Sequence, residues 1–407
     1  MEKLSKHIST RNFNAFVWHA SFLAIAKNFM DVDTIIPSML LKSGGTNFQL
    51  GLLTAIMVGG ARFSQILFIA PISGAQRKKP LLLGAINLRI LTLLGMALIF
   101  AFSGSLSGEL IIPFIFFIIT IFSFSGAFAN IPYTDILGKS VLPARRKQFF
   151  SLRTVISSAG IFASAFLVRE ILKSNEYPGN YAKVFAYAAL FLGIASLGFW
   201  RVKEFIPEGF KSIRIGIKSI IPTIKSNQRL KWYLLSINTL GIGYGMLPFI
   251  LLYANHNHML DSANGVGNLL LAKTLGLIVA GIWLHFRNDK AKYHQMMMLM
   301  IGLGVSFALL VLFFPTAGLA YLISFFIGGI FLSLYQIIIN GVLLEISDIE
   351  NRSLFTGISG AGSILPVIFP LFGGILISLI GFYGFFALFI VLTGLSFFFI
   401  RKLNCQN

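Results

Sequence analysis

Ionisable side chains stand inside long apolar stretches of this sequence, where they could bind a charged molecule or carry a proton. The stretch AIAKNFMDVDTIIP (24–37) contains Lys27, Asp31 and Asp33. If the stretch is helical, Lys27 and Asp31 are four residues apart on one face, and Asp33 points away from Asp31. Because charged groups are costly to bury without a partner, this spacing predicts either an internal ion pair or a hydrated binding site.

Two other apolar stretches carry polar groups that could join this site. Arg62 and Gln65 are three residues apart, so a helix would present them on one side. Lys273 lies in the apolar stretch GVGNLLLAKTLGLIVAG. Together with Lys27, these cations slightly outweigh the two acids of the first stretch. That balance favours an anionic or zwitterionic organic ligand.

The composition indicates what surrounds these groups. Of the 407 residues, 56% are hydrophobic and 12% are charged, and the mean hydropathy is +0.82, whereas about 25% of a soluble chain is charged. Apolar runs of about 20 residues, long enough to cross a bilayer as helices, recur from end to end. The sequence therefore predicts an all-α membrane protein with twelve transmembrane helices, at residues 12–38, 48–73, 80–102, 110–138, 149–172, 181–201, 231–254, 264–286, 293–314, 317–341, 353–378 and 381–401.

The basic residues indicate how the chain crosses the membrane. The net charge is +19, and with both termini in the cytoplasm most Lys and Arg residues fall in the tails and the cytoplasmic loops. Only Lys42, Lys173 and Lys183 fall on the opposite side. This asymmetry follows the positive-inside rule, so it argues against nucleic-acid binding. Short loops, short tails and the single cysteine, Cys405, favour a bacterial inner membrane.

Two segments far apart in the sequence resemble each other. SLRTVISSAG (151–160) aligns with SLFTGISGAG (353–362), and the same offset relates Tyr133 to Tyr335. Such internal repeats predict two pseudo-symmetric halves. The basic segment between the halves is predicted to be either a solvated linker or an amphipathic helix on the membrane surface. We therefore expect an N-terminal six-helix bundle, a basic cytoplasmic linker and a C-terminal six-helix bundle, at residues 1–201, 202–230 and 231–407.

This layout resembles the major facilitator superfamily over essentially the whole chain. The resemblance rests on the six-plus-six arrangement, the basic loop GAQRKKPLLLG, the exit YTDILGKSVLPARRKQFFSLR of the fourth span and the Gly/Pro-rich GISGAGSILPVIFPLFGG of the eleventh. In the loop, Lys78 and Lys79 keep the basic end of the family's motif, but Gly74 replaces its acid. The resemblance implies a secondary active transporter that works by alternating access, without a cofactor or a bound metal.

The resemblance also suggests which residues contact the substrate or the coupling ion. In similar transporters an acid on the first span often carries the proton, which points to Asp31 first and Asp33 second. Spans one, four, seven and ten line the cavity in such proteins, so uncharged polar residues on spans seven and ten are expected to bind the substrate. The candidates are Lys27, Asp31, Asp33, Arg62, Gln65, Lys273, Asn238, Tyr244, Tyr335, Gln336 and Asn340.

Other charged residues are expected to hold or gate the helices. Arg89 on the third span is interpreted as a packing or gating partner of Asp135 at the end of the fourth. Arg153 and Arg169 lie near span ends, where long side chains can reach the interface, so a structural role is expected. The gating candidates are Arg89, Asp135, Lys78 and Lys79.

The favoured function is proton-coupled transport, such as symport, of a small solute by a protein that acts as a monomer. The first alternative is drug efflux by proton antiport, although the fifth span, VISSAGIFASAFLV, lacks the Gly-Pro motif of such antiporters. A polytopic membrane enzyme of lipid or envelope metabolism and a non-transporting receptor are further alternatives. His256 and Asp261 have an acyltransferase-like spacing, and His256 and His258 could hold a metal. Neither pair is complete for its chemistry, so we expect no enzyme.

Overall fold

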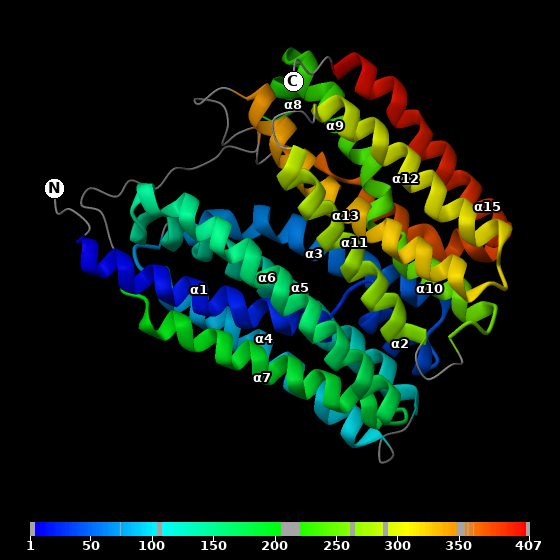
Figure 1. Ribbon diagram of the computed structural model, residues 1–407, viewed down its shortest axis with the longest axis horizontal. Coiled ribbons are helices and arrows are strands. Elements are labelled where there is room, and N and C mark those ends of the chain that lie inside the picture. The colour runs from blue at the N-terminus through cyan, green and yellow to red at the C-terminus, as the bar shows by residue number, and fades with distance from the viewer. Residues whose placement is uncertain are drawn as a thin grey trace. The chain divides into compact units, whose positions relative to one another are not determined.

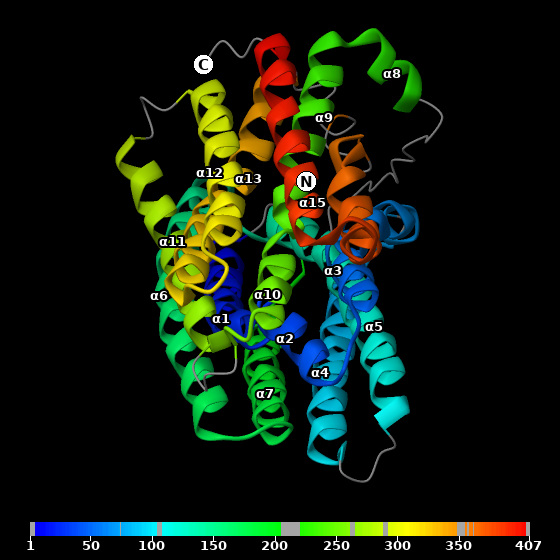
Figure 2. The same cartoon turned by 90° about the vertical axis from the view of Figure 1, so that its right-hand side faces the viewer.

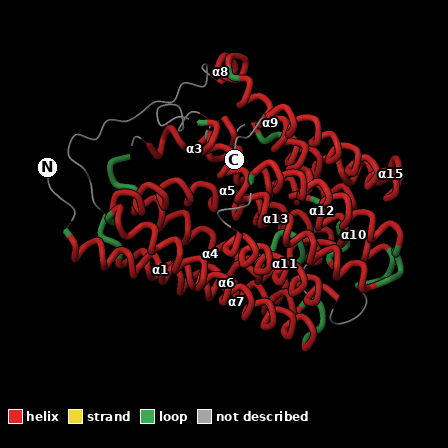
Figure 3. Tube along the Cα trace, turned by 45° about the horizontal axis from the view of Figure 1, so that its top comes forward, coloured by secondary structure: helices red, strands yellow, loops and turns green. Residues whose placement is uncertain are grey.

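The protein consists of helices joined by loops, as the tube in Figure 3 shows for the described residues. A computed structural model describes residues 5–403 except 74, 104–107, 205–219, 261–264, 288–291, 348–354, 356, 357 and 361. Within some helices only the backbone is described, which leaves the side chains of Arg62, Gln65 and Asn340 outside the description. Most of the predicted linker and Asp261 also lie outside the described residues.

Eight helices in the described part of the chain are long and apolar enough to cross a membrane. They are Lys79–Ala101, Leu110–Ser140, Gly179–Arg201, Gln228–His256, Gly265–Leu284, Tyr293–Phe313, Gly318–Leu343 and Ile358–Leu403. The prediction of an all-α membrane protein is confirmed, but the count of twelve spans is not. The last of these helices covers most of the predicted span 353–378 and all of the predicted span 381–401. They meet at Gly381, whose φ of 70° is a conformation that suits glycine.

The predicted first span, 12–38, is not one helix. Helix α1 (Lys6–Phe29) ends where the backbone N–H of Met30 bonds to the carbonyl of Lys27, and α2 (Ile35–Lys42) begins after a turn. Asp31 and Asp33 lie in the break, and short acidic side chains favour turns over helix interiors. The predicted shared face of Lys27 and Asp31 is therefore wrong, because Asp31 is not part of α1.

The contacts divide the chain into two compact units. The first comprises Met1–Asp31 and Gly60–Arg214, and the second comprises Val32–Gly59 and Ile215–Asn407. The sequence places Val32–Gly59 in the N-terminal bundle, whereas its contacts group it with the second half of the chain. Helix α3 (Asn47–Ser73) contributes to both units.

Glycines allow the first part of α3 to lie directly on the C-terminal half. A side chain at Gly51 would meet the carbonyl of Pro370, and one at Gly374 would meet the carbonyl of Asn47. Small residues let helix backbones approach each other closely in membrane proteins. Backbone contact of this kind explains why Val32–Gly59 groups with the second unit.

The first unit is built from α1 and four later helices. These are α4 (Lys79–Ala101), α5 (Gly108–Ser140), α6 (Pro143–Ser174) and α7 (Gly179–Arg201). Helix α7 packs against both α1 and α4, and α1 also packs against α6 (Figure 1). The buried ring of Phe16 stands in edge contact with Tyr133, Phe149 and Phe199, at centroid distances of 5.3, 6.1 and 5.5 Å. Such aromatic contacts join α1, α5, α6 and α7 into one core.

The second unit contains most of the remaining helices. They are α8 (Ile220–Ser226), α9 (Gln228–Gly241), the short 3-10 helix η3 (Ile242–Gly245), α10 (Leu247–His256), α11 (Gly265–Arg287), α12 (Tyr293–Phe313), α13 (Gly318–Ile346) and α15 (Leu365–Leu403). Helix α13 packs against both α11 and α12, and α15 lies along α9 (Figure 2). Gly241, Gly243 and Gly245 accompany the change from α9 through η3 to α10. The predicted seventh span is thus interrupted, like the first.

The internal repeat has a counterpart in the packing of each unit. Gly160 of α6 lies against Ala24 and Ile25 of α1, and Gly362 lies against Leu234 of α9. In each unit, the glycine at the end of the repeated segment therefore meets the first helix of its half. The two repeated segments therefore have similar packing in their units.

Candidate functional site

A buried ion pair joins the break between α1 and α2 to helix α11. The Nζ atom of Lys273 lies 2.7 Å from Oδ2 of Asp33, and the two side chains are only 4% and 7% exposed. Both residues are among the predicted site residues, but the sequence does not predict them as partners. Each charge neutralises the other, so a solute would have to compete with Asp33 for Lys273.

Helix packing fixes the position of Lys273. A side chain on Gly329 of α13 would collide with the carbonyl oxygen of Lys273, and one on Gly276 of α11 would collide with the carbonyl of Phe326. The backbones of α11 and α13 are therefore in direct contact around the lysine. Helix α2 packs against α10 and α11, which holds the break next to Lys273.

The break itself resembles the interrupted helices that bind ions in transporters. Asp33 directly precedes Thr34, the residue at the N-cap position of α2, and the positive end of a helix favours a carboxylate. Asp31, two residues earlier, is half-buried, and Thr34 is fully buried. Discontinuous helices with polar groups at their ends form the substrate and coupling sites of many secondary transporters.

Lys27 lies in the last turn of α1, where its side chain is exposed on the first unit. The positive charges of Arg89 and Arg153 act on it and on the buried His19. In the described part of the chain, no carboxylate lies within ion-pair distance of Lys27. The predicted grouping of Lys27 with acids is therefore not what the structure shows; its charged neighbours there are basic.

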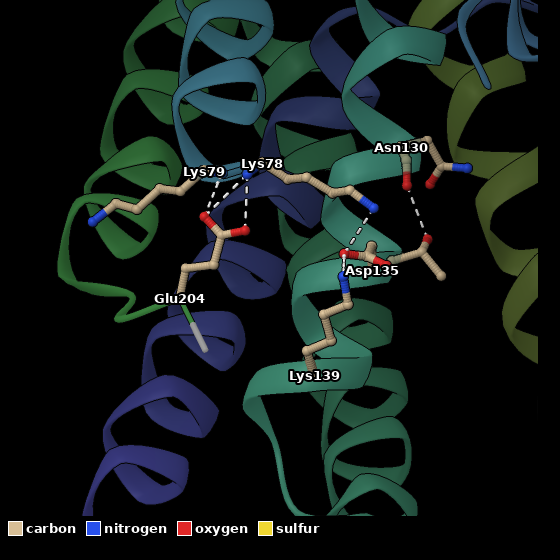
Figure 4. Close-up of polar contacts among 7 residues, drawn as sticks. Lys78, Lys79, Asn130, Asp135, Lys139 and Glu204 are labelled. Atoms are coloured by element: carbon tan, nitrogen blue, oxygen red, sulfur yellow. Dashed lines mark hydrogen bonds and ion pairs between the residues drawn. The ribbon is translucent and has the colours of Figure 1, made fainter. Parts of the chain in front are cut away.

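Arg89 does not pair with Asp135 as the sequence predicts. Its guanidinium lies over the ring of Phe122, 4.3 Å from the centroid, and against Gly126 of α5. Its buried Nε atom has no hydrogen-bond partner among the described residues. Asp135 is instead held by Lys78 and Lys139, whose Nζ atoms lie 3.0 and 2.7 Å from its Oδ2 (Figure 4).

A second carboxylate caps the start of α4. Glu204, just after α7, accepts bonds from the backbone N–H groups of Lys78 and Lys79 at distances of 2.8 to 3.1 Å (Figure 4). The ammonium of Lys79 in turn donates to the carbonyls of Trp200 and Val202. Sequence reasoning missed Glu204. No local pattern in the sequence signals that its carboxylate reaches the backbone of Lys78 and Lys79.

The polar residues of the second half use their hydrogen bonds internally. The amide of Asn238 donates to the carbonyl of Gly362 at 2.6 Å and accepts from the backbone of Ile364 and Leu365, each at 2.8 Å. The buried Tyr335 hydroxyl donates to the carbonyl of Ile237 at 2.9 Å. These contacts fix the start of α15 and the end of α9, so both residues have a structural role.

The other uncharged candidates differ in exposure. The ring of Tyr244 is half-buried and lies 5.8 Å from that of Tyr335, while Gln336 is exposed. Asn28, which the sequence reasoning did not single out, bonds to the carbonyl of Ile161 and to the hydroxyl of Ser164. It holds α6 against α1, much as Asn238 holds the corresponding segment of the other half.

Comparison with known proteins gives results at the level of structure alone. No family model matches the chain, and no curated protein matches it significantly. The structure is similar to that of the nucleoside transporter NupG, with a TM-score of 0.71 and 12% identity over 97% of this chain and 100% of that one.

Two further similarities involve other kinds of transporter. A peptide transporter, POT, solved in complex with sulfate, has a TM-score of 0.69 and 10% identity over 97% of this chain and 93% of that one. A bacterial homologue of the human lysosomal transporter Spinster has a TM-score of 0.59 and 12% identity over 98% of this chain and 95% of that one. All three neighbours are transporters and none is an enzyme. The chain therefore has the fold of the major facilitator superfamily.

Proposed function

We propose that the protein is a secondary active transporter that moves a small organic solute across a membrane by alternating access. The fold supports this function, because it is shared with transporters of unlike solutes. No Walker loop is visible in the sequence, so an ion gradient is the proposed source of energy. The proposed setting is a bacterial inner membrane, with both termini in the cytoplasm and the monomer as the working unit.

The buried pair of Lys273 and Asp33 is the observation that carries proton coupling. Protonation of Asp33 would remove the charge that balances Lys273 and leave the buried ammonium without this carboxylate. Such a group is strongly destabilising, so the proton would favour a state in which Lys273 is hydrated or bound to an anion. The sequence ranks Asp31 ahead of Asp33 as proton carrier, and the buried pair moves our proposal to Asp33.

The pair of Lys273 and Asp33 also supports a proposal for the class of solute that is transported. Lys273 can bind an anion only when Asp33 is protonated, whereas Lys27 has no acidic partner among the described residues. A solute that brings a negative charge could thus replace Asp33 while a proton neutralises the acid. This exchange links solute and proton binding thermodynamically, as coupled transport requires. We therefore propose an anionic or zwitterionic solute.

Ligand screening followed by flux measurement tests this function. Purified protein is screened for thermal stabilisation by anionic, neutral and cationic metabolites, since a bound ligand raises stability with occupancy. Solutes that stabilise it are then offered to proteoliposomes with and without an imposed pH gradient. Saturable flux of an anion or zwitterion, accelerated by the gradient, is the expected result. Binding without flux would indicate a receptor, and gradient-driven export of lipophilic cations would indicate drug efflux; either result contradicts the proposal.

A further inference from the structure

Two lysines from different helices lie close to the same tryptophan ring in the second unit. The ring belongs to Trp232 of α9, the helix along which α15 packs (Figure 2). The Nζ atoms of Lys231 on α9 and Lys402 on α15 lie 5.2 and 4.7 Å from its centroid. Phe399 of α15 stacks on the same ring, with 6.2 Å between the centroids. Because an aromatic ring attracts cations, Trp232 brings the two ammonium groups together.

The charges of this lysine pair, Lys231 and Lys402, are not neutralised by the helices that carry them. Neither α9 (Gln228–Gly241) nor α15 (Leu365–Leu403) contains an acid. Both lysines are exposed, and among the described residues their side chains have the indole as partner and no carboxylate. Arg401 adds a further positive charge at the same end of α15, where its guanidinium lies over Phe397. The place where α9 begins and α15 ends is therefore suited to an anion.

An exposed apolar stripe on α15 leads to Lys402. Its members Val391, Leu395 and Phe398 are 59%, 39% and 62% exposed. They follow one another at spacings of four and three residues, and Lys402 comes four residues later, so all four lie on one face of the helix. In a membrane protein, such a face contacts lipid acyl chains, and a basic residue at the helix end lies at the level of the headgroups.

We propose that the lysine pair binds the phosphate of an anionic phospholipid whose acyl chains lie along the apolar stripe. Ammonium groups form charge-assisted hydrogen bonds with phosphate, and basic residues at the end of a membrane helix attract anionic lipid. A choline headgroup brings its own positive charge next to the lysines, so charge complementarity favours a headgroup without one. Trp232 is a positioning residue, because it holds both ammonium groups. The site goes beyond transport, since it does not depend on which solute is moved.

Thermal stabilisation by added lipid tests the site. Purified protein in detergent is titrated with phosphatidylglycerol, with phosphatidylcholine of the same acyl chains and with glycerol 3-phosphate as a soluble phosphate ester. The site variants are Lys231→Gln, Lys402→Gln and Trp232→Leu, and Lys402→Arg conserves the charge. Lys203→Gln is the matched control. It removes one exposed charge after α7, on the side of the membrane where the sequence also places the lysine pair.

Phosphatidylglycerol is expected to raise the unfolding temperature more than either other probe. Lys231→Gln and Lys402→Gln should each weaken the apparent affinity for it about fivefold, whereas Lys402→Arg and Lys203→Gln should bind like wild type. Trp232→Leu should also weaken binding, although both lysines remain. Wild-type affinity in both Gln variants would overturn the site. An equal loss in Lys203→Gln would do so too, since it would indicate attraction by general surface charge, as would equal stabilisation by phosphatidylcholine or glycerol 3-phosphate.

Tryptophan fluorescence gives a second readout that does not depend on unfolding. Brominated acyl chains quench tryptophans that they contact, so the difference in quenching between wild type and Trp232→Phe reports lipid at this one ring. Brominated phosphatidylglycerol should quench this difference signal more than brominated phosphatidylcholine at the same mole fraction. The double variant Lys231→Gln/Lys402→Gln should lose that preference. Equal quenching by the two lipids in wild type would contradict the proposal.

Discussion

The ammonium of Lys273 and the carboxylate of Asp33 lie 2.7 Å apart in a buried environment, although 240 residues separate them in the chain. One charge stands in a helix break of the first half and the other in a helix of the second. The segment Val32–Gly59 packs with that second half. The pair therefore connects segments of different halves of the sequence.

Removal of one member of this pair should destabilise the protein. Lys273→Met or Asp33→Leu leaves a buried charge without its partner, which costs about 3–5 kcal/mol, whereas the double variant leaves none and should recover most of the loss. Thermal unfolding in detergent measures all three proteins. Additive losses in the double variant would show that the two residues are not coupled.

Asn238 should stabilise the start of α15. Asn238→Ala removes the amide that donates to the carbonyls of Leu234 and Gly362 and accepts from the backbone of Ile364 and Leu365, so we expect a loss of about 1–3 kcal/mol. Asn238→Asp keeps the acceptor for Ile364 and Leu365 but places a carboxylate oxygen against the carbonyls of Leu234 and Gly362, so it should not restore the stability. Unfolding temperatures measured in one detergent provide the comparison, and equal stability of wild type and Asn238→Ala would contradict the anchoring role.

Gly329 should be required for the close approach of α11 and α13. Gly329→Ala places a methyl group against the carbonyl of Lys273, and overpacking of this kind costs about 1–3 kcal/mol. Gly302→Ala on α12 is the matched control, because no heavy atom lies within 4 Å of the new methyl group. Thermal unfolding should show a loss only in the first variant. A loss of the same size in both would refute the packing argument.

Glu204 should contribute to stability as the cap of α4. Glu204→Ala exposes two backbone donors at Lys78 and Lys79, so a loss of about 0.5–2 kcal/mol is expected, as for other helix caps. Glu170→Gln removes an exposed carboxylate whose ion-pair partner among the described residues is its neighbour Arg169, and this change should affect stability little. Chemical unfolding of both variants tests this ranking, and a larger effect for Glu170→Gln would reverse it.

Much of the fold follows from the sequence because apolar runs of membrane length can only be helices. The interruption at Asp31 and Asp33 does not follow, since the apolar pattern continues through it. The wrong prediction that Lys27 and Asp31 share a helix face has the same cause. A spacing of four residues brings two side chains together only where the helix continues between them. The seventh predicted span, broken after Gly241, shows the same difficulty.

Local sequence patterns do not predict which residues far apart in the chain become partners in the site. The sequence predicts that Asn238 binds the substrate, whereas in the structure its amide bonds to the backbone of Gly362, Ile364 and Leu365.

The sequence predicts that Arg89 of the third span meets Asp135 at the end of the fourth. Asp135 pairs with Lys78 and Lys139 instead. Lys139 lies within reach because it is one helical turn away on α5.

Proton-driven accumulation is the measurement that tests the central claim most directly. Proteoliposomes with wild type, Asp31→Asn, Asp33→Asn and the neutral double variant Asp33→Asn/Lys273→Gln are compared in uphill uptake under a pH gradient and in downhill exchange of the same solute. The double variant keeps the pair uncharged and so guards against misfolding. Exchange without accumulation in both Asp33 variants, with accumulation kept in Asp31→Asn, is the result we predict. Accumulation at the wild-type level in Asp33→Asn would contradict the account.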